Sequence, residues 1–142
     1  MGGMEGSSPA RLYATLIGGT LVIGGIIGFF YSASFGGPGK VDDVFGVLSV
    51  NGWHNMVHIV TGGLGLILAG YAARQYALGL GVVYIAVAVW GFMIGSGESI
   101  LGFIPVNTAD NFLHLTLGVL GLAAGLATPV ARPGRRRTAQ PA

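Results

Sequence analysis

The residues of this chain that could carry chemistry lie in two copies of one motif. The first copy runs from Asn51 to His58, and the second runs from Asn107 to His114. The two copies contain all three histidines of the chain, and they differ where His54 aligns with Asp110. Histidine and carboxylate side chains bind transition metals, and histidine also exchanges protons near neutral pH. Any chemistry of this protein is therefore expected at these positions.

The spacing within each copy suits a metal site on two helices. His54 and His58 are spaced i, i+4, so both imidazoles project from one helix face, as in helical zinc sites. Asp110 and His114 have the same spacing in the second copy. Three imidazoles and one carboxylate suit Zn, Cu(II) or non-haem Fe. An alternative is a haem between His58 and His114, because bis-histidine ligation needs one imidazole from each of two facing helices.

A structural interpretation of the same residues is our first choice from the sequence. Asn51 and Asn107 stand where helices are expected to begin, and asparagine is a favoured helix N-cap. Asp110 is the third residue after Asn107, where a carboxylate can meet free backbone amides. Polar side chains further along each motif could form hydrogen bonds that join the two motif copies directly, across a pseudo-twofold axis, and fix the packing. These side chains are Asn55, His58, Asn111 and His114.

A third interpretation is a path for protons or a solute. Ionisable residues inside membranes are functional by default. Glu98, at the outer end of the third predicted helix, could extend a path from the histidines. The inner half of every predicted helix lacks ionisable groups, so the sequence shows no continuous relay.

The composition predicts an integral membrane protein. The chain has 142 residues, of which 52% are hydrophobic and only 8% are charged, whereas soluble domains carry about 25% charged residues. The chain lacks cysteine, which excludes disulfides, thiolate metal sites and cysteine nucleophiles. We find no phosphate loop, nucleophile triad or dinucleotide fingerprint, so we expect a non-enzymatic protein. The basic charge is confined to a short arginine tail, which does not indicate a nucleic-acid partner.

The hydrophobic runs predict an all-α fold, a transmembrane four-helix bundle over residues 11–130. A bilayer core requires about 20 apolar residues in a helix, and four runs meet this length. The predicted helices are 12–32, 52–72, 77–97 and 108–129. Residues 1–10 and 131–142 are polar and are predicted to be disordered. Segment 44–50 is apolar but short; it could be an interfacial segment before the second helix, and the sequence leaves open whether it lies on the membrane or enters it.

The positive charges predict the orientation of the bundle. With four spans, both termini and the loop between the second and third helices share one side. Only Lys40 lies on the opposite side. The positive-inside rule then places both termini in the cytoplasm, with Tyr13 and Tyr76 as anchors at the inner interface. The arginine tail could also bind anionic lipid headgroups. The cations on the inner side are Arg11, Arg74, Arg132, Arg135, Arg136 and Arg137.

The second and fourth helices run in the same direction, which predicts two parallel helix-pair repeats about an axis along the membrane normal. Each of these helices carries a stripe that is polar in its outer half and glycine-rich in its inner half. Glycine lets neighbouring helices approach closely. The first and third helices share little beyond glycines, so we infer the duplication from the second helix of each pair. The predicted packing glycines are Gly62, Gly65, Gly118, Gly121 and Gly125.

The paired motifs resemble a known family. The two copies, together with Tyr84, Trp90 and the run from Phe103 to His114, resemble a bacterial four-helix membrane-protein family, domain of unknown function family 4383. The resemblance covers about residues 10–130 and implies four spans in a bacterial plasma membrane. It implies no activity, cofactor or catalytic residue. We therefore predict a small structural or accessory membrane component that assembles with itself or a larger complex, with metal or haem binding as the alternative.

Overall fold

Four helices and two short β-hairpins make up residues 7–130, which our computed structural model describes. The helices are α1 (Pro9–Phe29), α2 (Gly52–Leu68), α3 (Ala73–Ile94) and α4 (Thr108–Ala127). The strands are β1 (Asp42–Val44), β2 (Leu48–Val50), β3 (Ser99–Ile100) and β4 (Ile104–Pro105). The four predicted helices are thus present, and the two hairpins were not predicted.

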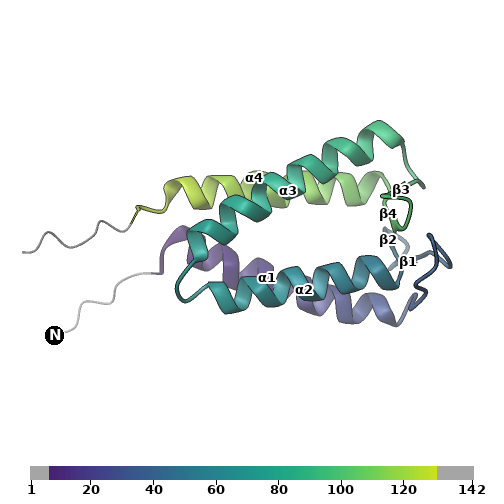
Figure 1. The fold of residues 1–142 in the computed structure, drawn as a ribbon, viewed down its shortest axis with the longest axis horizontal. Helices are drawn as coiled ribbons and strands as arrows, with labels where there is room; N and C mark the ends of the chain where they lie inside the picture. The colour runs from purple at the N-terminus through teal and green to yellow at the C-terminus, as the bar shows by residue number, and fades with distance from the viewer. Residues whose placement is uncertain (1–6, 131–142) are drawn as a thin grey trace, which may run out of the picture.

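The helices lie along one another as two neighbouring pairs (Figure 1). α1 packs mainly on α2, and α3 packs mainly on α4. Both hairpins lie at one end of the molecule, and the described chain begins and ends at the other end. We call these the hairpin end and the terminal end.

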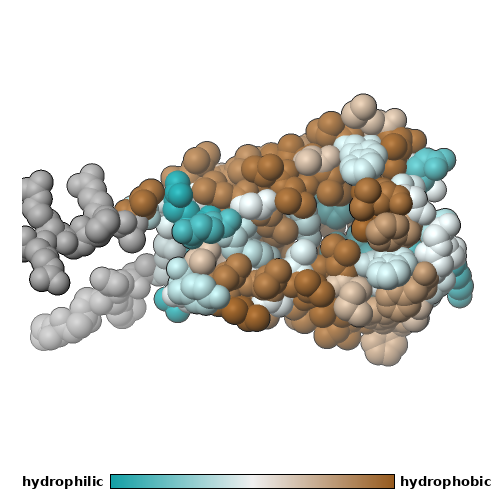
Figure 2. Space-filling model, in the orientation of Figure 1, coloured by the Kyte–Doolittle hydropathy of each residue, from teal (hydrophilic) through white to brown (hydrophobic). Residues whose placement is uncertain are grey.

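The outer surface of the bundle is apolar. Three helices, α1, α3 and α4, are long and apolar enough to cross a membrane. α2 has 17 residues, fewer than the about 20 that a bilayer core requires. On the face seen in Figure 2, hydrophobic residues cover the helices and most hydrophilic residues gather toward the two ends. These features identify a membrane protein.

The first helix begins earlier than the sequence predicted. Ser8 caps it, because its hydroxyl accepts a backbone N–H of the first turn at 3.2 Å, and Pro9 is favoured at the first helical position. Residues 9–10 are therefore helical, which corrects the prediction of disorder for them. Residues 1–6 and the arginine tail within 131–142 lie outside the described residues.

Segment 44–50 belongs to the first hairpin, where Val44 pairs with Leu48 in antiparallel register. The turn between the strands is tight, since Phe45 and Gly46 have φ of 52° and 70°. The prediction of an all-α chain missed this hairpin and its shorter counterpart formed by β3 and β4. Strands this short leave no alternating pattern long enough to recognise.

The predicted packing glycines lie where helices meet. A Cβ at Gly62 would lie 2.8 Å from Leu21 Cβ in α1, and a Cβ at Gly118 would lie 2.9 Å from the backbone nitrogen of Ile85 in α3. Contacts below 3.0 Å cannot be accepted without movement, so the two backbones set the spacing of each pair. Gly121 meets the backbone of Ala77 in α3 in the same way, whereas Gly125 meets the Leu78 side chain of α3 and Gly65 meets the Tyr76 ring of the other pair.

Two buried tyrosines join the pairs in the half of the bundle nearer the terminal end. The Tyr13 hydroxyl of α1 donates to the Leu117 carbonyl of α4 at 2.8 Å. The Tyr76 hydroxyl of α3 donates to the Thr61 carbonyl of α2 at 3.0 Å. Both rings are buried, so the prediction that they anchor the protein at the membrane interface is wrong. A tyrosine near a helix end can turn inward when a carbonyl is available there.

We expect Gly62→Ala to destabilise the protein by about 1–3 kcal/mol, because the added methyl group overpacks the contact with α1. Its neighbour Gly63 is the matched control, since nothing lies within 4 Å of a Cβ there. Gly63→Ala should be neutral or stabilising by up to about 1 kcal/mol, because alanine favours the helix. Thermal unfolding in detergent would measure both variants. Equal losses in the two variants would contradict the packing role of Gly62.

Candidate metal centre

Asn51 caps α2 and also ties it to the second hairpin. Its side-chain oxygen accepts from the backbone N–H of His54 at 2.9 Å. Its amide nitrogen donates to the carbonyls of Phe103 at 2.6 Å and Pro38 at 2.8 Å. The start of α2, and with it the position of His54, is therefore fixed by three hydrogen bonds to one fully buried side chain.

Asn107 does the same for α4 and the first hairpin. Its side chain accepts from the backbone N–H of Asp110 at 2.9 Å and donates to the Val47 carbonyl at 2.8 Å. The Asp110 carboxylate completes the capping box by accepting from the backbone N–H groups of Asn107 at 2.9 Å and Ser49 at 3.0 Å. Asp110, a predicted metal ligand, thus holds the start of α4 and lies outside the histidine cluster.

The two remaining asparagines of the motifs act within the pairs. The Asn55 amide donates to the carbonyl of Ser32, just beyond α1, at 2.8 Å. The side-chain oxygens of Asn55 and Asn111 are buried without a hydrogen-bond partner, and each lies against a glycine, Gly28 or Gly91. The hypothesis that they join the two motif copies directly is not supported by these contacts.

Three histidines from two helices converge at one point. His54 and His58 come from α2 and His114 comes from α4, and one ring nitrogen from each lies within 4.8 Å of the other two. The ring centroids are 4.5 Å apart for His54 and His58, and 5.9 Å and 6.0 Å from these rings to His114. His54 and His114 are only 1% and 5% exposed. We call this cluster the histidine triad.

The triad and the neighbouring Tyr84 contain buried polar atoms that no group within residues 7–130 satisfies. Both ring nitrogens of His54, Nδ1 of His114 and the hydroxyl of Tyr84 have no hydrogen-bond partner. An unpaired buried polar group costs about 1–3 kcal/mol. The carbonyls of Ser49 and Pro105 lie near the His54 ring, but neither forms a well-aligned hydrogen bond with it. Metal-binding imidazoles commonly donate their second N–H to such carbonyls.

Tyr84 is a member of this region that sequence reasoning did not assign. Its ring lies edge-on to His114 with centroids 5.0 Å apart, and it is 4% exposed. Its position on α3 carried no repeat or spacing signal toward the motifs. The family resemblance includes Tyr84, but it implies no role for this residue.

Comparison with known families agrees with the helical pattern. Residues 11–127 match the model of a family described as Domain of unknown function (DUF4383). The chain belongs to this family. The match spans all four helices apart from Pro9 and Ala10 of α1, and it includes the histidine triad, which confirms the resemblance seen in the motifs. No curated protein and no solved structure matches this DUF4383 chain, so its function must be argued from the site.

The space around the triad favours a bare ion over a haem. Metal–nitrogen bonds of about 2.0–2.1 Å place two ligand nitrogens of a tetrahedral site about 3.4 Å apart. The triad nitrogens lie within 4.8 Å of one another, so they would need to approach by at most about 1.4 Å to bind one ion. The cavity that touches all three rings has a volume of about 80 Å³, whereas pockets for larger ligands measure about 300–1,000 Å³.

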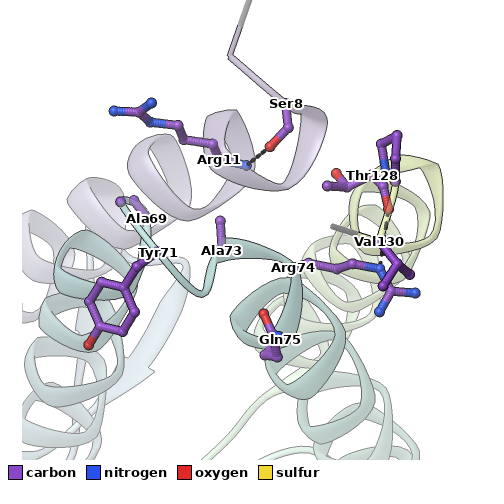
Figure 3. Close-up of a pocket in the computed structure, with 11 residues that line it drawn as sticks. Ser8, Arg11, Ala69, Tyr71, Ala73, Arg74, Gln75, Thr128 and Val130 are labelled. Atoms are coloured by element: carbon purple, nitrogen blue, oxygen red, sulfur yellow. Dashed lines mark hydrogen bonds between the residues drawn. The ribbon is translucent and has the colours of Figure 1, made fainter. Parts of the chain in front are cut away.

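The terminal end of this DUF4383 protein holds a separate, basic pocket of about 350 Å³ (Figure 3). Arg11 and Arg74 line it, and Arg74 Nε donates to the Thr128 carbonyl at 3.2 Å. The two guanidinium groups point away from each other in Figure 3. No carboxylate or imidazole is among the described residues that line it, so the candidate chemistry lies with the triad alone.

We expect His54→Leu to leave the stability of the metal-free protein unchanged or to raise it by up to about 1–3 kcal/mol. The substitution removes two unpaired nitrogens and keeps most of the side-chain volume. Asn51→Leu is the matched comparison and should destabilise, because that side chain makes three hydrogen bonds. Thermal unfolding in the presence of a chelator would measure both. A clear loss for His54→Leu would assign the imidazole a structural role.

Proposed function

We propose that this membrane protein binds one divalent transition-metal ion through His54, His58 and His114. The observation that carries the proposal is the convergence of three imidazoles, two of them buried, with ring nitrogens within 4.8 Å of one another. Three imidazoles suit Zn, Cu or non-haem Fe. A site with three protein ligands keeps a position open for water or another ligand.

The hydrogen bonds of the motif favour this function over the purely structural one. A structural role requires the polar atoms of each side chain to be used in packing or capping, and the capping asparagines and Asp110 are used in this way. The His54 ring makes no hydrogen bond although it is almost fully buried. The side-chain oxygens of Asn55 and Asn111 are unpaired as well, but the histidines differ in that their ring nitrogens converge at one point.

Reciprocal hydrogen bonds support the finer architecture of two parallel helix-pair repeats. Asn51 donates to the Phe103 carbonyl, and Asn107 donates to the Val47 carbonyl. The two donors are separated in the sequence by the same number of residues as the two acceptors. Each helix pair therefore holds the hairpin of the other in an equivalent way.

The first helix of each pair also supports the proposal of two helix-pair repeats, although α1 and α3 align with a different sequence offset. Tyr13 and Tyr76 make equivalent hydrogen bonds, and their acceptors, Leu117 and Thr61, are related by the same offset as the two motif copies. The two tyrosines themselves are further apart in the sequence, because the loop before the first hairpin is longer than the loop before the second. The relationship between α1 and α3 is therefore missed when the two helix pairs are aligned with one sequence offset for both of their helices.

For the setting, we propose a bacterial plasma membrane with both termini in the cytoplasm and α2 as a fourth span. At the hairpin end, the two hairpins would cover the remaining distance between the start of the short α2 helix and the outer membrane surface. Arg11 and Arg74 at the terminal end agree with the positive-inside rule and could contact anionic lipid headgroups. The glycine-lined contacts are already filled within the chain, so any partner complex would use the lipid-facing surface.

We expect the protein purified in detergent to bind about one equivalent of Zn(II) or Cu(II) after metal loading, measured by elemental analysis after desalting. His58→Ala and His114→Ala should lose most of this metal, because each removes one of three ligands. Metal at about 100 times Kd should stabilise the wild-type protein by about 2.7 kcal/mol. Absence of stoichiometric metal after loading would refute the proposed function.

Asp110→Asn serves as the control for metal binding. An asparagine side-chain oxygen can still accept hydrogen bonds from the backbone N–H groups that donate to Asp110, so the cap is largely retained. We expect this variant to keep its metal. Loss of metal in Asp110→Asn, with stability unchanged, would restore Asp110 as a ligand.

We expect single cysteines to report the orientation, since the chain has none of its own. A membrane-impermeant maleimide should label Lys40→Cys in intact spheroplasts and should label Gln75→Cys only after the membrane is permeabilised. Both positions are exposed in the structure, so the contrast reports membrane sidedness. The reverse pattern would overturn the proposed orientation.

A further inference from the structure

Two cavities flank the histidine triad on opposite sides. The α1–α4 cavity has a volume of about 160 Å³ and is bordered by His58 and His114. The α2–α3 cavity has a volume of about 80 Å³ and is bordered by all three histidines. Apart from the imidazoles, the Asp110 carboxylate and Thr20 in the larger cavity, and Thr61 and Tyr84 in the smaller one, their linings are aliphatic. A metal bound by the triad would therefore have an apolar space on each side.

The two cavities occupy corresponding places and differ in how far side chains fill them. Leu21 and Gly24 of α1 line the larger cavity. Tyr84 and Val87 of α3 line the smaller one, at positions related to these by the offset that takes Tyr13 to Tyr76. The tyrosine and the valine are each larger than their counterparts. The larger volume of the α1–α4 cavity follows from these differences.

The α1–α4 cavity reaches the surface that faces lipid. Gly24 and Thr20 both line it and are exposed on the outside of α1. Nothing lies within 4 Å of a Cβ built at Gly24, so the cavity wall is thin at this residue. Because α1 is apolar enough to cross a membrane, the space outside Gly24 is hydrocarbon. A molecule entering here would come from the bilayer.

The size and lining of the cavity indicate its occupant. An apolar cavity of about 150 Å³ stays dry and binds benzene or xenon, and the α1–α4 cavity is similar at about 160 Å³. An anion or a polar substrate would lose its hydration there with little compensation. A small neutral molecule that dissolves in hydrocarbon would lose nothing.

We propose that the α1–α4 cavity admits a neutral molecule the size of dioxygen or carbon monoxide from the bilayer to the open position of the metal. The inference rests on the proposed metal site, and it adds the class of ligand and its route. His58 and His114 form the inner wall of the cavity, so a molecule in the cavity lies beside two of the three ligands. Gly24 controls the entrance.

The test uses carbon monoxide binding to the full-length protein loaded with copper(I), followed by its infrared stretching band. We expect the wild-type protein to bind carbon monoxide and Gly24→Leu to bind it at least tenfold more slowly. Gly19→Leu, on the same helix and with no atom within 4 Å of its Cβ, does not line the cavity and should match the wild type. Equal rates in all three proteins would overturn the route through the cavity.

A second measurement does not depend on metal. Xenon should bind the metal-free wild-type protein, as detected by xenon NMR, and Leu21→Tyr should abolish this binding by placing in α1 the side chain that α3 carries at the corresponding position. Absence of xenon binding in the wild type would overturn the cavity's role. Failure to load copper, zinc and iron alike, with xenon still bound, would refute the metal site and the inference that rests on it.

Discussion

A polar group inside a bilayer must find its partner within the protein, because no water is available to replace one. This constraint accounts for how the two helix pairs are joined. Tyr13 and Tyr76 each donate to a backbone carbonyl of the opposite pair, and Asn51 and Asn107 each donate to the opposite hairpin. Hydrogen bonds at two depths thus hold together surfaces that the hydrophobic effect would not drive together in lipid.

The same constraint singles out the histidines. Once the caps and the tyrosines are paired, the unpaired buried nitrogens that remain are concentrated in His54 and His114, next to the unpaired hydroxyl of Tyr84. Glycine contacts within each pair and the tyrosine hydrogen bonds between the pairs hold the four helices against one another, and the imidazoles of α2 and α4 meet in this frame. An ion with affinity for nitrogen would satisfy several of these groups at once.

Much of this arrangement could be predicted from the sequence, and the failures have physical causes. The i, i+4 spacing brought His54 and His58 to one face, and the repeated motif correctly pointed to His114. Spacing cannot tell whether a carboxylate near a helix start turns toward the core or toward free amides, and Asp110 does the latter. The hairpins are too short to show a period, and the longer loop before the first one hid the correspondence between α1 and α3.

The difference between His54 and Asp110 at matched positions bears on symmetry. Two identical chains, each with one motif, would place the same side chain on both sides of a twofold axis. They could offer only a balanced set of ligands around that axis. A single chain that carries both motifs is free of this identity, and here it brings three imidazoles together while the carboxylate aligned with His54 closes a helix end. Joining the two pairs in one polypeptide is thus what allows the unequal set of side chains at the centre that we propose holds one ion.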